Sequence, residues 1–178
     1  MTAEAQRTLS AVALLRVLNA ELLRHDSATL TLERWCVGHG IGAGSPVVAR
    51  RVAVPEIPLL AEQQQRLAVS AGMPIRYRRV QLWCADVLLS EADNWYVPGR
   101  LSEAQNRLIE ETDIPFGRAL QDVHFRRHTV SARVLWYPLP GSAEIPLSVL
   151  EHRAVLSLPD GTPLSEVVET YTRNLLQV

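Results

Sequence analysis

The spacing of apolar residues along the chain changes between a helical and a strand period. Apolar residues recur at helical spacing in residues 3–24. Asp26 and Ser27 follow as a stop and as N-cap candidates for a short helical turn through Trp35. The same reasoning predicts later helical segments at residues 59–72, 102–111 and 113–120, with Ser102 capping the second of them.

Apolar runs with strand character alternate with turn signals through the rest of the sequence. Hairpin follows hairpin, with Asp86 near one turn and "PDGT" (159–162) at another, and helices stand before or between them. This order predicts an α+β fold with a mainly antiparallel sheet, in one domain spanning residues 1–178. The loop from Pro138 to Pro146 is either a flap or a plain connection. The expected strands are residues 47–54, 75–84, 87–97, 123–137, 149–158 and 164–175.

Composition narrows the classes of function. The chain has 178 residues, is 47% hydrophobic and has a net charge of −1, so we expect neither a nucleic-acid nor a membrane partner. All 18 basic side chains are arginine, which excludes lysine Schiff-base chemistry and a P-loop lysine. Two cysteines make no disulfide framework, and the N-terminus lacks the pattern of a signal peptide, so we expect a cytoplasmic protein.

Other candidate motifs give no cofactor or metal site. The glycines of "GHGIGAGSP" follow a helix and precede a strand, the reverse of a phosphate-binding turn. His124 and His128, four apart on an expected strand, would lie roughly 13 Å apart, too far for one metal ion. Packing explains Cys36 and Cys84 better than catalysis does. We therefore expect neither a cofactor nor a metal.

The strand "YRRVQLWCADVLL" (77–89) raises a separate question, because it carries two adjacent arginines. Neighbouring residues of a strand point to opposite faces, so either Arg78 or Arg79 must point inward. A buried guanidinium needs an anion, either from the protein or from a ligand. An internal pair between Arg79 and Glu169, which lies on a late strand, is one solution, and a bound acid is the other.

The sequence resembles the chorismate pyruvate-lyase family, whose members split chorismate into 4-hydroxybenzoate and pyruvate. The resemblance is carried in order by "LLRHDSATLTLE" (22–33), "RVQLWCAD" (79–86), "ADNWYVP" (92–98), "IPFGRAL" (114–120) and "DGTPLSEVVETY" (160–171). It implies a six-stranded antiparallel sheet with helices closing a buried ligand cavity. It also implies a lyase that needs no cofactor.

By this resemblance, Arg79 matches the arginine that binds the carboxylate of the product, and Glu169 matches the glutamate at the hydroxyl end of the ring. These two residues are the expected catalytic pair. Phe116 and Gly117 match the turn whose backbone N–H groups support the same anion, and Ala28 falls where the family has a methionine lining the cavity. The oligomeric state, monomer or dimer, stays open.

Asn94 departs from the family pattern, because the bacterial ubiquinone-pathway enzymes have a second arginine there. Chorismate carries two carboxylates, and asparagine donates a hydrogen bond without bringing a charge. Three hypotheses follow: a chorismate lyase-type enzyme, a non-catalytic binder or sensor of an aromatic carboxylic acid on the same fold, and an internal salt bridge with no ligand. In the first two, the partner is a small aromatic or enolpyruvyl carboxylate.

Overall fold

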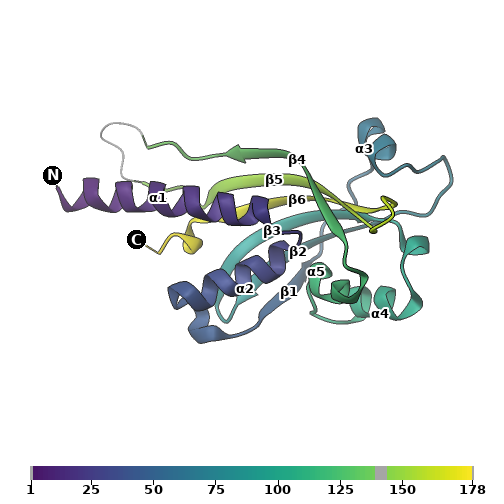
Figure 1. Ribbon diagram of the computed structural model, residues 1–178, viewed down its shortest axis with the longest axis horizontal. Helices are drawn as coiled ribbons and strands as arrows, with labels where there is room; N and C mark the ends of the chain where they lie inside the picture. Colours follow the sequence, from purple (N-terminus) through teal and green to yellow (C-terminus); the bar gives the residue numbers. More distant parts are fainter. Residues whose placement is uncertain (1, 139–143, 178) are drawn as a thin grey trace.

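A computed structural model describes residues 2–138 and 144–177 of the chain, and within them six strands form one antiparallel sheet (Figure 1). Each strand pairs antiparallel with its neighbours, as the sequence predicted. Across the sheet, the strands are β1 (Val47–Val52), β2 (Arg76–Cys84), β3 (Val87–Tyr96), β6 (Pro163–Thr172), β5 (Ser148–Ser157) and β4 (Arg126–Val134).

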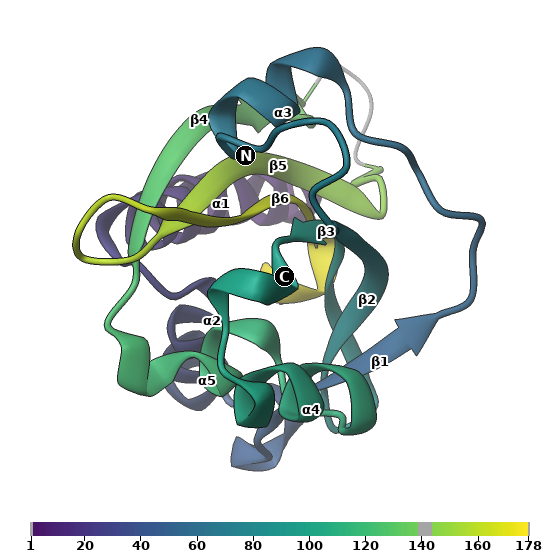
Figure 2. The same ribbon diagram turned by 90° about the vertical axis from the view of Figure 1, so that its right-hand side faces the viewer.

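The sheet is strongly curved, and helices lie on both of its sides (Figure 2). Helices α1, α2 and α4 and the single turn α5 lie on its concave side, and α3 lies on the opposite side. The helices are α1 (Ala3–Arg24), α2 (Ala28–His39), α3 (Ala61–Arg66), α4 (Glu103–Glu111) and α5 (Phe116–Ala119); short 3-10 turns are Ile41–Gly44, Pro98–Arg100, Gln121–Val123 and Arg173–Leu175.

Serine side chains begin two of these helices, as predicted from the sequence. The Ser27 hydroxyl accepts a hydrogen bond from the backbone N–H of Leu30 at 3.2 Å. The Ser102 hydroxyl accepts one from Gln105 N at 3.1 Å, and the Gln105 side chain accepts one from Ser102 N at 2.8 Å. Both caps satisfy amide groups that have no acceptor within the helix. They fix where α2 and α4 start, and therefore where their side chains meet the sheet.

Several predicted elements are shorter than expected, and in two of them the backbone turns where the pattern would continue. The expected helix at 59–72 is formed only over Ala61–Arg66, since Ala68 takes a φ of 48° that no helix allows. The expected strand at 123–137 begins only at Arg126, because His124 has a φ of 52°. His124 therefore ends a 3-10 turn and does not share a strand with His128.

The largest apolar cluster lies between α1, α2 and the sheet. Ala11, Leu15, Leu18 and Leu22 of α1 are each at most 3% exposed. Burying a leucine side chain contributes roughly 1.5–3 kcal/mol, so this face holds α1 on the sheet. A second, smaller cluster joins α4 and α5 to the other end of the sheet and includes Tyr96, Ile109 and Phe116. The candidate site lies between the two clusters.

Charged groups on the convex side of the sheet are paired within the protein. Glu166 is fully buried on β6 and accepts two hydrogen bonds of 2.8 Å from Arg66 of α3. Arg153 of β5 donates a third at 3.0 Å. These ion pairs hold α3 against the sheet and leave the carboxylate satisfied.

Candidate functional site

A cavity lies between the concave face of the sheet and helices α2 and α5. It contains about 470 Å³ of empty space, part of which opens to solvent at the mouth. The centre of a water molecule can reach only about 40 Å³ of it, well below the roughly 150 Å³ of an apolar cavity that admits benzene. A ring-sized ligand would therefore enter only if lining side chains moved. A shallower cleft shares Asp26, Gly117 and Phe125 with the cavity and adjoins it.

Five of the residues predicted from the sequence line this cavity together. Asn94 comes from β3, Glu169 from β6, Ala28 from the first turn of α2, and Phe116 and Gly117 from α5. The fold thus brings into one cavity residues that are as much as 141 positions apart in the chain.

Arg79 does not line the cavity, and the expectation that it points inward is wrong. Its side chain lies on the other face of β2, 27% exposed, where Nε and Nη2 donate to Asp93 at 2.8 and 3.0 Å. The expected pair between Arg79 and Glu169 is not formed either. Instead, Arg78 is the inward arginine, on the face that it shares with Val80 and Leu82.

Arg78 is a buried cation with unused donors. Its side chain is 6% exposed, and Nη1 donates to the backbone oxygen of Ile109 at 2.9 Å. Among residues 2–138 and 144–177, no acceptor lies within hydrogen-bond distance of its Nε or Nη2. Burial lowers the pKa of Arg78 to about 10; the Arg51 charge acts in the same direction, and Tyr96 opposes both. Arg78 is therefore charged at neutral pH, and no carboxylate among the described residues pairs with it.

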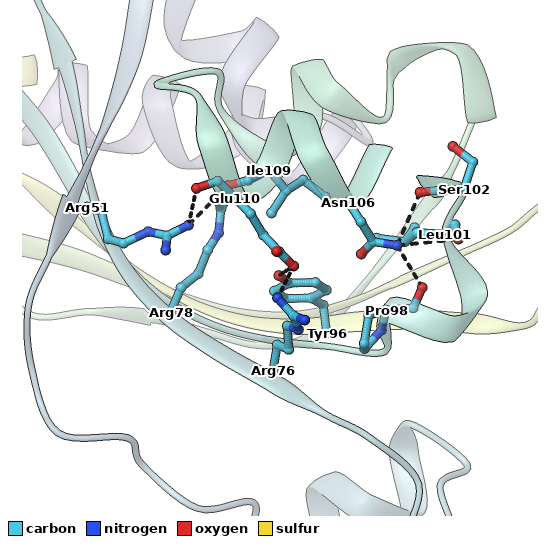
Figure 3. Close-up of polar contacts among 10 residues, drawn as sticks. All are labelled: Arg51, Arg76, Arg78, Tyr96, Pro98, Leu101, Ser102, Asn106, Ile109 and Glu110. Atoms are coloured by element: carbon cyan, nitrogen blue, oxygen red, sulfur yellow. Dashed lines mark hydrogen bonds and ion pairs between the residues drawn. The ribbon is translucent and has the colours of Figure 1, made fainter. Parts of the chain in front are cut away.

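The end of α4 fixes the direction of Arg78 (Figure 3). Arg51 Nη2 donates to the backbone oxygens of Ile109 and Glu110 at 3.3 and 3.1 Å, beside the bond from Arg78. Carbonyl groups at a helix C-terminus carry partial negative charge and lack partners within the helix. Glu110 also pairs with Arg76 and accepts from Tyr96 at 3.2 Å. One edge of the Arg78 guanidinium is thereby held, whereas Nε and Nη2 on the other edge have no hydrogen-bond partner among the described residues.

Asn94 stands beside Arg78 on the next strand. The two residues are direct cross-strand partners, which places their Cβ atoms about 4.5–5.5 Å apart. Asn94 is 2% exposed, and its Oδ1 atom has no hydrogen-bond partner within the described part of the chain. A buried amide oxygen without a partner costs folding free energy, and a ligand that donates a hydrogen bond to Asn94 would remove this cost.

Glu169 lies in an internal cluster on the other side of the cavity. Its Oε2 atom accepts from Arg127 Nη2 at 2.5 Å and from the Tyr171 hydroxyl at 2.9 Å. Burial alone would lower the pKa of Arg127, but Glu169 and Tyr171 together outweigh it and the pKa is raised. Burial, followed by the Glu169 charge, raises the pKa of Tyr171 well above its usual range. The cluster is therefore an ion pair with a neutral phenol that donates to it.

His152 is the cross-strand neighbour of Glu169 and is fully buried. Its Nε2 atom lies 2.7 Å from Oδ1 of Asn19, a residue of α1, and its ring packs edge-on against Tyr171 at 5.4 Å. Burial lowers the pKa of His152 to about 4, although Glu169 opposes this shift. His152 is thus neutral at pH 7 and ties α1 to the strand behind the cavity.

The wall opposite the sheet depends on a close approach between α5 and α2. A Cβ atom at Gly117 would lie 3.0 Å from Ser27 Oγ and 3.2 Å from Thr29 Oγ1, so a larger residue would force these side chains to shift by a few tenths of an ångström. The Phe116 ring lies 5.5 Å from the Arg78 guanidinium carbon. Its face can attract that cation, which contributes on the order of 1 kcal/mol.

The charges around the cavity do not balance. Arg78 and Arg127 are buried cations, and Glu169 is the buried carboxylate among the lining residues; Asp26, at the mouth, is half exposed and pairs with Arg126 at 3.5 Å. One positive charge therefore stays uncompensated, and it is that of Arg78. An anionic group with an apolar body fits such a site, because it would supply the missing charge and the missing acceptors.

Arg78, Arg127, Tyr171 and His152 were not identified as site residues from the sequence. Arg127 could have been suspected, because it also belongs to an adjacent arginine pair on a strand. In the part of the chain that the structure describes, no cluster of three or more side chains could hold a metal ion. Over the same residues, no helix has the length and hydropathy to cross a membrane.

Solved structures share this fold at low sequence identity. The effector domain of PhnF from Mycobacterium smegmatis has a TM-score of 0.54 at 13% identity and covers 83% of this chain and 88% of that domain. The ligand-binding domain of a regulator from Bordetella bronchiseptica, assigned to the GntR family, has a TM-score of 0.52 at 16% identity. This match covers 71% of this chain and 84% of that domain. YydK of Bacillus subtilis, described as a possible transcriptional regulator, has a TM-score of 0.50 at 13% identity. This match covers 72% of this chain and 58% of YydK. This chain has the chorismate lyase-like fold of these domains.

A curated protein sequence is more similar than any of these structures. No family model matches the chain. It is, however, 48% identical over 183 residues to the uncharacterized protein y4mC of Sinorhizobium fredii, and the alignment covers 94% of this chain and 77% of y4mC. Identity at this level over most of both sequences implies common descent, and the chain belongs to the same protein family as y4mC.

Proposed function

We propose that this chain binds a small aromatic monocarboxylic acid in the cavity and acts as a ligand-binding or sensor domain. The observation that carries the proposal is the buried Arg78 guanidinium: Arg78 lines the cavity, and its Nε and Nη2 atoms have no hydrogen-bond partner among the described residues. A carboxylate can accept from both of these donors at once, because the guanidinium fork matches its geometry. The apolar walls would hold the ring.

The charge balance favours a monoanion. One carboxylate would neutralise the cavity, whereas a dianion would leave a buried negative charge unless the second group reached solvent. The fold shared with the effector and ligand-binding domains of regulators supports a binding role and does not specify the ligand. The small free volume implies that other lining side chains, such as that of Phe116, move when the acid enters.

Thermal unfolding with added benzoate and 4-hydroxybenzoate tests this function. A ligand that binds only the folded state raises the melting temperature in a concentration-dependent way. We expect this rise for the wild type, its loss in Arg78→Met, and its retention in Arg79→Met. If neither acid raises the melting temperature at millimolar concentration, the proposed function is wrong.

A chorismate lyase-type reaction is the second candidate, and the position of Glu169 favours it. The resemblance places a glutamate in the same cavity as the arginine that binds the carboxylate. Glu169 lies in this cavity, and the spacing of the strands separates its Cα atom from that of Arg78 by roughly 12 Å. Arg78 would bind the ring carboxylate, and Glu169 would accept from the ring hydroxyl. Against it, chorismate brings a second carboxylate, and Asn94 offers no charge to it.

Incubation of the purified protein with chorismate decides between the two. Appearance of 4-hydroxybenzoate absorbance together with pyruvate would establish the lyase. Absence of both products, with a raised melting temperature in 4-hydroxybenzoate, would establish the binder. That the chain contacts no nucleic acid stays a prediction.

A further inference from the structure

Two unmet polar groups stand side by side in the cavity, and the proposed carboxylate satisfies only one of them. Arg78 and Asn94 face each other across β2 and β3, and Val167 continues the same row on β6. The acid of the proposed function would occupy Nε and Nη2 of Arg78. The amide of Asn94 would still face the ligand, with its buried oxygen unpaired.

We infer that Asn94 selects the ligand, and that the preferred acid carries a hydroxyl group close to its carboxylate, in the meta position of a benzoate ring. This inference rests on the proposed function. A hydroxyl both donates and accepts, so it can satisfy the Asn94 oxygen or, if the amide turns over, its NH₂ group. A ring C–H or a methyl group at the same place leaves the buried amide unpaired.

The position of the hydroxyl follows from the register of the sheet. Arg78 and Asn94 are a cross-strand pair and lie side by side, so a ring substituent near the carboxylate is the one within reach of Asn94. Glu169 lies two residues beyond Val167 along β6, about 7 Å further from this row. A para hydroxyl would therefore approach Glu169, and a meta hydroxyl would approach Asn94.

The sequence had suggested another role for this position, as a substitute for an arginine that serves a second carboxylate. The surroundings of Asn94 do not support a second anion there. Its cross-strand partner Arg78 is held by Ile109, and the buried charges of the cavity leave a single positive charge to be neutralised. A neutral hydrogen-bonding group matches an amide without adding a charge that nothing balances.

A pair of ligands of matched size tests the inference. 3-Hydroxybenzoate and 3-methylbenzoate differ only in replacing a hydroxyl by a methyl group, and the meta hydroxyl is too distant to bond to its own carboxylate. Isothermal titration calorimetry should show that the wild type binds the hydroxy acid about tenfold more tightly, as expected for one buried polar group left unpaired. In Asn94→Leu, a near-isosteric change, the two acids should bind with equal affinity or the methyl acid more tightly.

Two further measurements keep the outcome decisive. The preference of 4-hydroxybenzoate over 4-methylbenzoate should be the same in Asn94→Leu as in the wild type, because that hydroxyl lies toward Glu169. If Asn94→Leu does not fold, Asn94→Ser should fold and reduce the meta preference without abolishing binding. An unchanged meta preference in either variant overturns the inference and leaves the binding function standing. Failure of every acid, benzoate included, to bind the wild type overturns both.

Discussion

Replacing each of the adjacent arginines on β2 by methionine gives opposite results if Arg78 is the binding group. Arg78→Met removes a buried cation, and Arg79→Met removes one half of a partly exposed ion pair. Methionine keeps a long, flexible apolar side chain, so packing changes little in either variant. The two variants differ only in which face of the same strand loses its charge.

The magnitude for Arg78 follows from its pKa, which burial lowers from its usual value to about 10. This shift corresponds to on the order of 3 kcal/mol that the folded protein loses by holding the charge there. Methionine recovers that amount but loses the hydrogen bond to Ile109, which contributes roughly 1.5–3 kcal/mol because it is made to a charged group. The free energy of unfolding without ligand should therefore stay within about 1–2 kcal/mol of the wild type.

The expected effect of Arg79→Met is a small loss of stability with no effect on binding. Its bidentate pair with Asp93 is partly exposed, so losing it should lower the free energy of unfolding by about 1 kcal/mol or less. Urea unfolding, with and without 10 mM benzoate, measures both quantities. The reasoning is refuted if benzoate still stabilises Arg78→Met, or if Arg79→Met abolishes the stabilisation.

Other perturbations test the rest of the cavity. Glu169→Gln leaves Arg127 as a second unpaired buried cation and should lower the free energy of unfolding by about 3–5 kcal/mol in urea; a loss below 1 kcal/mol would contradict the ion-pair assignment. Gly117→Ala should lower it by about 1–3 kcal/mol through overpacking against Ser27 and Thr29, whereas Gly99→Ala, with open space around it, should lose less; equal losses would contradict the close approach. Because burial holds the pKa of His152 near 4, below the 6.5 of an unfolded chain, the unfolded state binds the extra proton between these pH values, and stability falls as pH falls through that window. From pH 7 to pH 4.5 this effect should remove about 2–3 kcal/mol from the wild type and from the exposed His128→Gln control, but not from His152→Gln; equal acid sensitivity of all three would contradict it.

The sequence predicted the elements more reliably than the faces of the strands. The long amphipathic pattern of α1 and the serine caps of α2 and α4 are local signals, and the structure confirms them. The expected helix at 59–72 is formed only over the six residues Ala61–Arg66, because the backbone turns at Ala68. Hydrophobic spacing alone carries no information about such a turn.

The predicted binding arginine, Arg79, differs by one position from Arg78, the arginine that lines the cavity. A shift of one position along a strand exchanges its two faces, and a short family motif can be matched in either register. The composition of the two faces did contain a signal: Arg78 shares its face with the aliphatic residues Val80 and Leu82 and with Cys84, whereas Arg79 shares its face with Tyr77, Gln81 and Trp83, which all carry polar atoms. The more apolar face is the one that is buried.

Arg127 could not have been assigned by the same reasoning. Its strand alternates between exposed and half-buried residues and has no clear apolar face, because β4 is an edge strand of the sheet. The burial of Arg127 depends on Glu169 and Tyr171, which lie on another strand. Pairings of this kind arise from tertiary structure and cannot be inferred from local spacing.

A crystal structure of the protein grown with saturating 4-hydroxybenzoate tests the central claim most directly. The account predicts one acid in the cavity, with its carboxylate about 2.7–3.2 Å from Nε and Nη2 of Arg78 and its hydroxyl directed toward Glu169. An empty cavity at saturating ligand, or a carboxylate bound on the Arg79 face of β2, would contradict it.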